Sequence, residues 1–334
     1  MPTIQALQAL RAIAAWLVVY HHYMQMVHHG YSQSPVGAFF VQYGLVGVDV
    51  FFIISGFIMY YSLTLKPRTA QAFLLARIRR IVPVYWVYTG LAIMAANLVK
   101  DQVEYVWTYR SLIQSLLFIP HQNPTGIGEF PLLTVGWTLN FEMFFYSVLT
   151  LNLQLFRRYA FIVTAMVLLL LPMLWPTDWF YAGICTSKRL NEFSLGILLG
   201  YLYVKTPLLR NPNYGWLAAI ASILLLAVVY WMNQNAFQAY ALLLVLSALG
   251  LERLPNWRHW FFNALLKLGD MSYSTYLAHA IILFLLNSFI SQPASALSEV
   301  LFLFTLTILV YILSFLSFQG IERGWLLDRL TRLY

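Results

Sequence analysis

The chain has 334 residues, of which 61% are hydrophobic and 10% are charged, and its mean hydropathy is +0.70. Soluble domains carry about a quarter charged residues, so this chain lacks the polar groups to cover a water-facing surface and is expected to be a polytopic membrane protein. Its single cysteine, Cys185, excludes an internal disulfide and fits no cysteine-based metal site. The residues before Arg11 lack the basic segment of a cleavable signal peptide.

The predicted elements are helices. A transmembrane helix needs about 20 mostly apolar residues, and the segments that qualify are 6–27, 43–63, 81–99, 133–153, 159–175, 190–204, 214–232, 236–251, 271–290 and 297–318. The sequence therefore predicts an all-α bundle of about ten transmembrane helices, forming a single integral-membrane domain over 1–334. The apolar stretch Ser111–Pro120 is too short to span and is expected to be interfacial or re-entrant. It belongs to the longest loop, 100–132, which is a candidate functional loop.

The 20 Lys and Arg residues predict the orientation. If the N-terminus is cytoplasmic, sixteen of them fall on the cytoplasmic side, and the other four are Lys100, Arg110, Lys188 and Arg189. The positive-inside rule then places both termini in the cytoplasm. This distribution accounts for most of the net charge of +8, so a nucleic-acid partner is not needed to explain it.

The first predicted span contains Arg11, His21 and His22. Arg11 and His22 are eleven positions apart, which places them on one helix face about 16 Å apart, whereas His21 points about 100° away. Arg11 is either a functional group or an anchor that reaches the interface. His22 is either bonded to a carbonyl or functional; ionisable residues in spans usually face a cavity. Because a neutral imidazole is a natural general base, His22 is the candidate catalytic residue.

Two acids lie inside other spans. Asp49, near the outer end of the second span, could orient a histidine as the acid of a catalytic triad does, or serve as a cap or an ion pair. Glu142, near the middle of the fourth span, follows Trp137 and Asn140 in "TVGWTLNFEMFFYSVL". A glutamate at this depth usually marks a pathway or a catalytic site, and the alternative is a bond to a neighbouring helix.

Arginines precede the third span in "ARIRRIVPVYW". Arg77 and Arg80 are three positions apart and share a helix face, with Arg79 to one side. They are either simple cytoplasmic charge or a phosphate site, because arginine forks bind phosphates. Such a pair suits a nucleotide-bearing cofactor. Pro83 is expected at a helix start, which tolerates proline.

The ninth span contributes "SYSTYLAH", in which Tyr276 and His279 are three positions apart and can meet. Gly196 and Gly200 form a GxxxG pattern, which is more typical of helix packing than of chemistry.

Together these motifs resemble the membrane acyltransferase 3 family. The resemblance covers essentially the whole chain and rests on Arg11 and His22 in an R-x10-H pattern, "GVDVFFIISGF", the R-x-x-R of Arg77 and Arg80, "WTLNFE" and "SYSTYLAH". It implies a helix bundle without a required metal in the inner membrane of a bacterium. It also implies O-acetylation of an exopolysaccharide or O-antigen, with acyl-CoA, usually acetyl-CoA, as the donor entering from the cytoplasm.

The resemblance also implies roles for single residues. His22 would be catalytic and Arg11 would support it, Arg77 and Arg80 would hold the CoA phosphates, and Asp49 and Glu142 match further motif acids of the catalytic group. The candidate substrate-binding residues are Trp137, Asn140, Tyr276 and His279. Many members carry an additional hydrolase-like domain; none is expected in this chain.

Two other functions stay open at this point. A transporter would also place charged residues in its spans, although it usually has inverted repeats, and the sequence has no such symmetry. A subunit of a polysaccharide export complex would not need His22. The expected partners are acyl-CoA, a glycan or lipid-linked glycan acceptor and membrane lipid, without nucleic acid.

Overall fold

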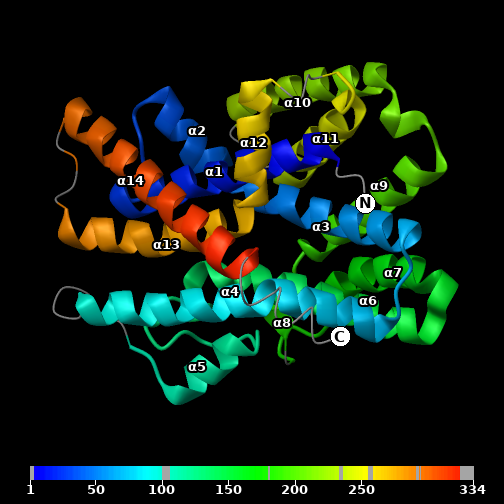
Figure 1. Cartoon of the computed structure of the whole chain (residues 1–334), viewed down its shortest axis with the longest axis horizontal. Coiled ribbons are helices and arrows are strands. Elements are labelled where there is room, and N and C mark those ends of the chain that lie inside the picture. The colour runs from blue at the N-terminus through cyan, green and yellow to red at the C-terminus, as the bar shows by residue number, and fades with distance from the viewer. Residues whose placement is uncertain are drawn as a thin grey trace. The chain divides into compact units, whose positions relative to one another are not determined.

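The structure is a computed structural model that describes residues 4–99, 106–179, 181–232, 236–254, 259–290, 293 and 295–323. Within these residues the chain is all-α, and each predicted span forms a helix (Figure 1). These helices are α1 (Gln5–Val27), α3 (Val46–Leu65), α4 (Ala70–Leu98), α6 (Trp137–Phe156), α7 (Ala160–Leu174), α9 (Leu190–Lys205), α10 (Pro212–Met232), α11 (Phe237–Leu251), α13 (Ser272–Phe289) and α14 (Ala296–Ser317). The predicted all-α class is therefore confirmed.

Shorter elements connect these helices. They are α2 (Pro35–Tyr43), α5 (Tyr109–Leu116), α8 (Ala182–Cys185), α12 (Trp260–Asp270), the 3-10 turns Thr134–Gly136, Arg157–Tyr159 and Leu208–Arg210, and the π-helix Phe318–Glu322. The stretch predicted to be too short to span forms α5, which has only 8 residues. Both chain termini lie outside the described residues, so their predicted cytoplasmic position stays a prediction.

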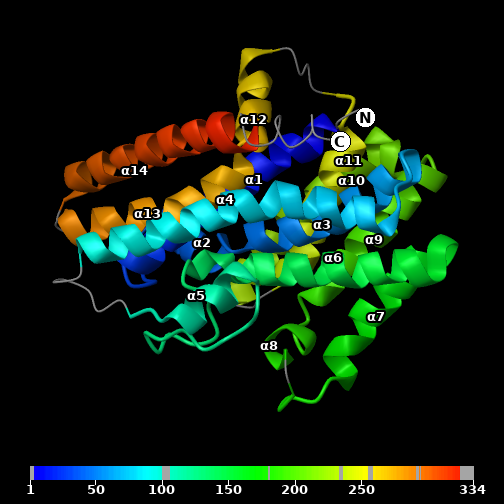
Figure 2. The ribbon, with the colours of Figure 1, turned by 60° about the horizontal axis from the view of Figure 1, so that its bottom comes forward.

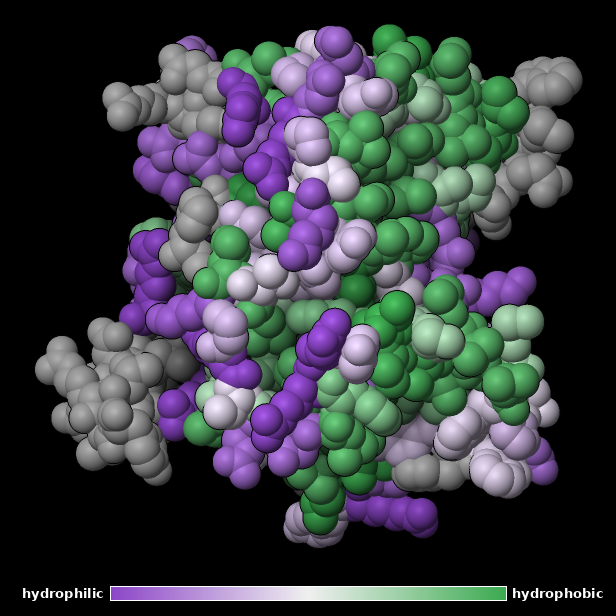
Figure 3. Space-filling model, turned by 90° about the vertical axis from the view of Figure 1, so that its right-hand side faces the viewer, coloured by the Kyte–Doolittle hydropathy of each residue, from purple (hydrophilic) through white to green (hydrophobic). Residues whose placement is uncertain are grey.

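By length and apolarity alone, five helical stretches of the described residues qualify as membrane spans: Val46–Leu65, Ala70–Leu98, Thr134–Leu174, Pro212–Val229 and Ala296–Glu322. Helix α1 has 23 residues, but its arginine, histidines and glutamines lower its hydropathy. Helices α9 and α11, with 16 and 15 residues, are short for a span. Exposed apolar side chains such as Met173, Ile223 and Leu297, 79%, 68% and 70% exposed, fit contact with lipid. Hydrophobic residues cover large areas of the face in Figure 3, with hydrophilic residues between them.

The chain forms two compact units. The first unit comprises Met1–Val18, Tyr43–Leu74 and Phe144–Asp270. In its core, α3 packs so closely against α9 that a side chain at Gly56 or Gly196 would collide with the backbone of the facing helix. The GxxxG prediction of helix packing is thus confirmed.

The Glu252 carboxylate caps the N-terminus of α1. It accepts hydrogen bonds from the backbone N–H groups of Gln5 and Ala6 at 2.9 and 2.6 Å. Burial raises the pKa of Glu252, and these two donors oppose that rise.

The second unit comprises Val19–Gln42, Leu75–Met143 and Met271–Tyr334. In this unit α13 and α14 run side by side (Figures 1 and 2). Helix α5 is joined to α4 by the Trp86 indole N–H, which donates to the Leu116 carbonyl at 2.9 Å.

One local prediction was wrong. Helix α4 begins at Ala70, so Arg77 and Arg80 lie inside it and Pro83 lies in its interior instead of at its start. A proline there removes one backbone N–H donor from the helix. The helix continues because the apolar residues on both sides of Pro83 supply a long buried or lipid-facing surface, which outweighs the loss of one bond.

Candidate active site

The candidate catalytic residue His22 lies at the wall of a cavity in the second unit. His22 is half-buried in α1, and the cavity has a volume of about 360 Å³. Its other walls come from α4, from α13 and from the loop before α6, and they include Ala92, Ala95, Leu132, Val135, Ile281 and Phe284. An ionisable side chain in a span thus lies at a cavity, as expected for a functional residue.

A second histidine is bonded to His22. The Nδ1 atom of His22 and the Nε2 atom of His279 are 3.1 Å apart, and the ring centroids are 5.0 Å apart. His279 lies in α13 and is fully buried. Its Nδ1 atom is 3.3 Å from the Thr275 carbonyl oxygen. The structure therefore brings a predicted catalytic residue together with a predicted substrate-binding residue.

These bonds define the tautomers. A carbonyl oxygen only accepts hydrogen bonds, so the Nδ1 atom of His279 must carry the proton that it donates to Thr275. A charged imidazolium is costly at a fully buried position, so we assign His279 as neutral with an accepting Nε2. His22 then donates its Nδ1 proton to His279, and its Nε2 atom is the basic nitrogen.

Tyr276 joins this pair to the wall of the cavity. Its ring centroid is 5.6 Å from that of His279, so the predicted meeting of the two residues is confirmed. The Tyr276 hydroxyl donates to the Val135 carbonyl at 2.8 Å and accepts from the Thr138 hydroxyl at 2.9 Å. These bonds fix the start of α6 against α13 at the edge of the cavity.

His21 has a different environment. Its Nδ1 atom donates to the Phe40 carbonyl at 3.0 Å, which joins α1 to α2. His21 and His22 therefore face different partners, as the predicted angle between them requires.

The long loop before α6 lines the cavity with Asn123, Thr125 and Ile127. The Asn123 amide nitrogen donates to the Phe130 and Pro131 carbonyls at 3.3 and 3.2 Å. Its oxygen accepts from the Thr125 N–H at 3.0 Å and from the Thr125 hydroxyl at 2.6 Å. Asn123 thus organises the loop, and Thr125 still has an acceptor lone pair to offer a ligand.

The predicted phosphate site lies on α4 of the same unit. Arg77 is half-buried, and its Nε atom is buried with no hydrogen-bond partner among the described residues. Arg80 is exposed. A buried guanidinium N–H without a partner is costly, and an anionic ligand would satisfy it.

The Tyr273 hydroxyl lies near the same stretch and donates to the Ile81 carbonyl at 2.9 Å. Arg80 and Glu142 both act electrostatically on this hydroxyl. Glu142 is half-buried in α6, and its role stays a prediction.

The other two predicted residues of α6 differ in exposure. Asn140 is buried, 6% exposed, and its side-chain oxygen has no hydrogen-bond partner within the described part of the chain. Trp137 is half-buried and makes an edge-to-face contact with Phe141, with centroids 5.7 Å apart. Asn140 therefore has an unused acceptor inside the unit.

Arg11 belongs to the first unit, near the start of α1. Its guanidinium is 3.5 Å from the Gln8 side-chain oxygen, and the Gln8 amide donates to Asp270 at 2.7 Å. Helix α1 is continuous from Gln5 to Val27, so Arg11 and His22 lie on one helix, as predicted.

Asp49 forms an ion pair in the first unit. It is 2% exposed, and its carboxylate is 3.2 Å from the Arg189 guanidinium. Glu192 lies beside Asp49, and the two carboxyl groups act on each other electrostatically. The Gln238 amide donates to Glu192 at 3.0 Å. Asp49 therefore has an ion-pair partner, one of the two alternatives that the sequence left open.

Sequence reasoning missed Glu192 as a member of this cluster. Its signal was available, because a glutamate inside the predicted span 190–204 is as unusual as Glu142. Glu192 is fully buried.

The acyltransferase 3 family model, described as an acyltransferase domain, matches residues 4–318. The chain belongs to the acyltransferase 3 family. This confirms the resemblance inferred from the motifs, and the protein is an acyltransferase with several apolar helices that make it a multi-pass membrane protein.

The acyltransferase is similar to several curated proteins. It is 34% identical to the exopolysaccharide production protein ExoZ of Rhizobium meliloti (strain 1021) over 242 residues, which cover 71% of this chain and 75% of ExoZ. It is 25% identical to nodulation protein 10 of Rhizobium leguminosarum bv. viciae over 314 residues, 82% and 81% of the two chains. It is 24% identical to "Putative O-acetyltransferase SACOL0978" of Staphylococcus aureus (strain COL) over 330 residues, 86% of this chain and 52% of that protein. No solved structure matches it.

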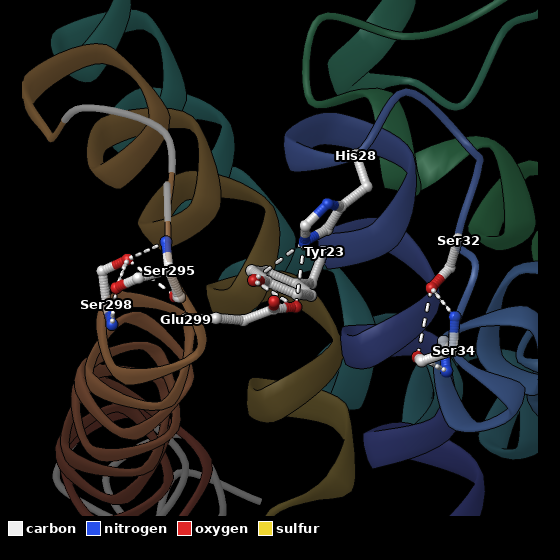
Figure 4. A network of polar contacts seen from close by, with 8 residues as sticks. Tyr23, His28, Ser32, Ser34, Ser295, Ser298 and Glu299 are labelled. Atoms are coloured by element: carbon white, nitrogen blue, oxygen red, sulfur yellow. Dashed lines mark hydrogen bonds and ion pairs between the residues drawn. The ribbon is translucent and has the colours of Figure 1, made fainter.

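The acyltransferase has one further polar network that the sequence did not indicate. The Nε2 atom of His28 is 3.0 Å from the Oε1 atom of Glu299. The Tyr23 hydroxyl donates to the same Oε1 atom at 3.4 Å and is 3.2 Å from the Nε2 atom of His28. Figure 4 shows these three side chains pointing toward one another. Since Tyr23 follows His22 in α1, this network fixes the end of α1 to the start of α14 beside the candidate catalytic residue.

The described part of the acyltransferase contains no group of three or more His, Cys, Asp or Glu residues that could hold a metal ion. The expected absence of a metal stays a prediction.

Proposed function

We propose that this acyltransferase transfers an acetyl group from acetyl-CoA to a hydroxyl of an exported or cell-surface polysaccharide, or of its lipid-linked precursor, in the inner membrane of a bacterium. The observation that carries the proposal is the bond between His22, which lines a cavity, and the buried His279. Its support from relatives is the exopolysaccharide production named for ExoZ and the O-acetyl transfer named for the staphylococcal protein.

In this proposal His22 is the general base. Its Nε2 atom accepts the proton of the acceptor hydroxyl while that oxygen bonds to the acyl carbon. The carbon–sulfur bond breaks, and His22 returns the proton to the sulfur, so that free CoA leaves. A positive charge on His22 is stabilised because its Nδ1 proton stays bonded to the neutral Nε2 atom of His279.

The donor would be held by Arg77 and Arg80. The buried Nε atom of Arg77 without a partner fits a phosphate ligand, and the exposed Arg80 adds a second guanidinium on the same helix face. Bound acetyl-CoA supplies the acyl group as a thioester. Arg11 would support the reaction from the same helix as His22.

The acceptor would enter the cavity. A volume of about 360 Å³ lies in the range of small-ligand sites, large enough for a sugar unit. Its walls are mainly apolar, with polar groups from Thr125 and Thr134, and this combination suits the apolar face and the hydroxyl groups of a sugar. Asn140 and Trp137 are further candidates for acceptor contacts.

The test is release of CoA by the purified protein with acetyl-CoA and the polysaccharide of the source cell, combined with mass spectrometry of the acetylated product. Positioned acid–base groups contribute a factor of about 10²–10⁴ to the rate. The transfer rate of His22→Gln should therefore fall by that factor, because glutamine can form a hydrogen bond but cannot accept and return the proton. The matched control is His21→Gln, which should remain much more active, because His21 is bonded to the Phe40 carbonyl.

Two outcomes would contradict the proposal. One is His22→Gln transferring acetyl groups at a near-normal rate. The other is a protein that moves the polysaccharide across vesicles without releasing CoA, as a transporter would.

A further inference from the structure

A groove in the first unit is lined by none of the residues assigned to catalysis. It has a volume of about 1040 Å³ and is formed by the end of α3, the turn before α4, the end of α6, the start of α7 and α9. Its lining includes the arginines Arg68, Arg157 and Arg158. We call it the arginine groove.

The arginines lie in the two turns that border the groove. Arg68 lies between α3 and α4, and Arg157 and Arg158 lie between α6 and α7. All three are exposed, and none of the lining residues is acidic. The Arg158 guanidinium lies over the Tyr159 ring at 4.9 Å from its centroid. Three positive charges therefore border the groove without a carboxylate among its lining residues.

The walls of the groove are apolar. They include Leu63, Phe161, Ile162, Ala165, Ile197 and Leu198. Ile162 and Leu198 are 60% and 51% exposed, and both lie on helices of a membrane protein. Such walls need an apolar ligand to cover them, and the arginines need an anion.

Only a ligand that has both an anionic group and an apolar part fits this groove. A free phosphate would leave the apolar walls uncovered, a neutral lipid would leave the arginines without a partner, and acetyl-CoA has only a two-carbon acyl group. We propose that the arginine groove binds an anionic phospholipid, whose phosphate contacts Arg68, Arg157 and Arg158 and whose acyl chain lies along Ile162 and Leu198. The bound lipid joins the α3–α4 turn to the α6–α7 turn and is not a substrate.

The test measures binding of phosphatidylglycerol and phosphatidylcholine to the purified full chain by native mass spectrometry in detergent. The groove variant carries Arg68→Gln, Arg157→Gln and Arg158→Gln. The matched control carries Lys66→Gln, Lys205→Gln and Arg253→Gln, which removes the same number of charges from exposed residues outside the groove lining. The groove variant should bind phosphatidylglycerol at least about tenfold more weakly than the control, because it loses charge-assisted hydrogen bonds. Phosphatidylcholine should bind weakly to both.

A second variant tests the apolar walls. Ala165→Phe should fill part of the groove and weaken phosphatidylglycerol binding while all arginines remain. Circular dichroism and thermal unfolding without lipid check that each variant is folded.

Three results would overturn the proposal. The groove variant and the control could lose phosphatidylglycerol equally, which would indicate general attraction to positive charge. Phosphatidylcholine could bind as tightly as phosphatidylglycerol. Glycerol phosphate or acetyl-CoA could compete as effectively as the lipid, which would make the groove a site for soluble anions. None of these readouts depends on acetyl transfer, so failure here and failure of the proposed function are distinguishable.

Discussion

At the residue scale, the orientation of His22 depends on a neutral partner. In a catalytic triad a carboxylate accepts the Nδ1 proton of the histidine, whereas here the acceptor is the Nε2 atom of His279. His279 is itself oriented by the Thr275 carbonyl. The hydrogen-bonded chain from Thr275 to His22 therefore sets which nitrogen of His22 is basic.

This chain predicts a distinction between two substitutions of His279. His279→Phe keeps the ring but removes the acceptor, so turnover should fall by about tenfold or more, as for loss of a hydrogen bond to a group that becomes charged. His279→Gln offers an amide oxygen to His22 and should recover a large part of that loss. The measurement is kcat for CoA release with both substrates saturating.

Equal turnover in the Phe and Gln variants would contradict a positioning role for His279. A rise in KM for the acceptor at unchanged kcat would instead support the original prediction that His279 binds substrate.

At the element scale, helix α4 carries the proposed donor site. Phosphate contacts act about equally before and at the transition state, so Arg80→Ala should raise KM for acetyl-CoA by about tenfold with little change in kcat. Arg79→Ala, on the adjacent face of α4, is the matched control and should have a smaller effect. Steady-state kinetics over a range of acetyl-CoA concentrations check this. A fall in kcat at saturating acetyl-CoA, with KM unchanged, would show that Arg80 does not act through binding.

Asp49 in α3 pairs with Arg189, the residue before the start of α9, and loss of this ion pair should destabilise the protein. Arg189→Gln leaves a buried carboxylate without its partner, and breaking a buried pair costs about 3 kcal/mol or more. Lys188→Gln removes a neighbouring exposed charge and should have little effect. Thermal unfolding in detergent should therefore show a lower Tm for Arg189→Gln alone.

The double variant Asp49→Asn with Arg189→Gln should recover part of the Tm lost in Arg189→Gln, because Asp49→Asn removes the unpaired charge. If Arg189→Gln and Lys188→Gln unfolded at the same temperature, the ion pair would not contribute to stability.

At the scale of the whole molecule, the charge distribution predicts which loops face the cytoplasm. Tyr31 follows α1 and is 67% exposed, and Lys205 ends α9 and is exposed. In a Cys185→Ser background, a membrane-impermeant maleimide should label Tyr31→Cys in intact cells. It should label Lys205→Cys only after the membrane is permeabilised. The reverse pattern would show that the N-terminus is outside.

The sequence by itself determined the helices, the membrane class and the family. Long apolar segments are local features, and ten of them appear as helices where they were predicted, because hydropathy and helix formation depend on neighbouring residues. The sequence also determined that Arg77 and Arg80 share a face and that His21 and His22 do not, because both follow from helix geometry. It misplaced the start of α4, because packing and burial around Pro83 outweigh the local cost of proline.

Only the tertiary structure decided which side chains meet. His22 and His279 are 257 positions apart, and Asp49 and Arg189 are 140 positions apart. No local pattern specifies such pairs, because they depend on how the helices pack. For the same reason, the sequence showed that Asp49 needed a partner but not that the partner was Arg189, and it showed a candidate base in His22 but not the neighbour that sets its tautomer.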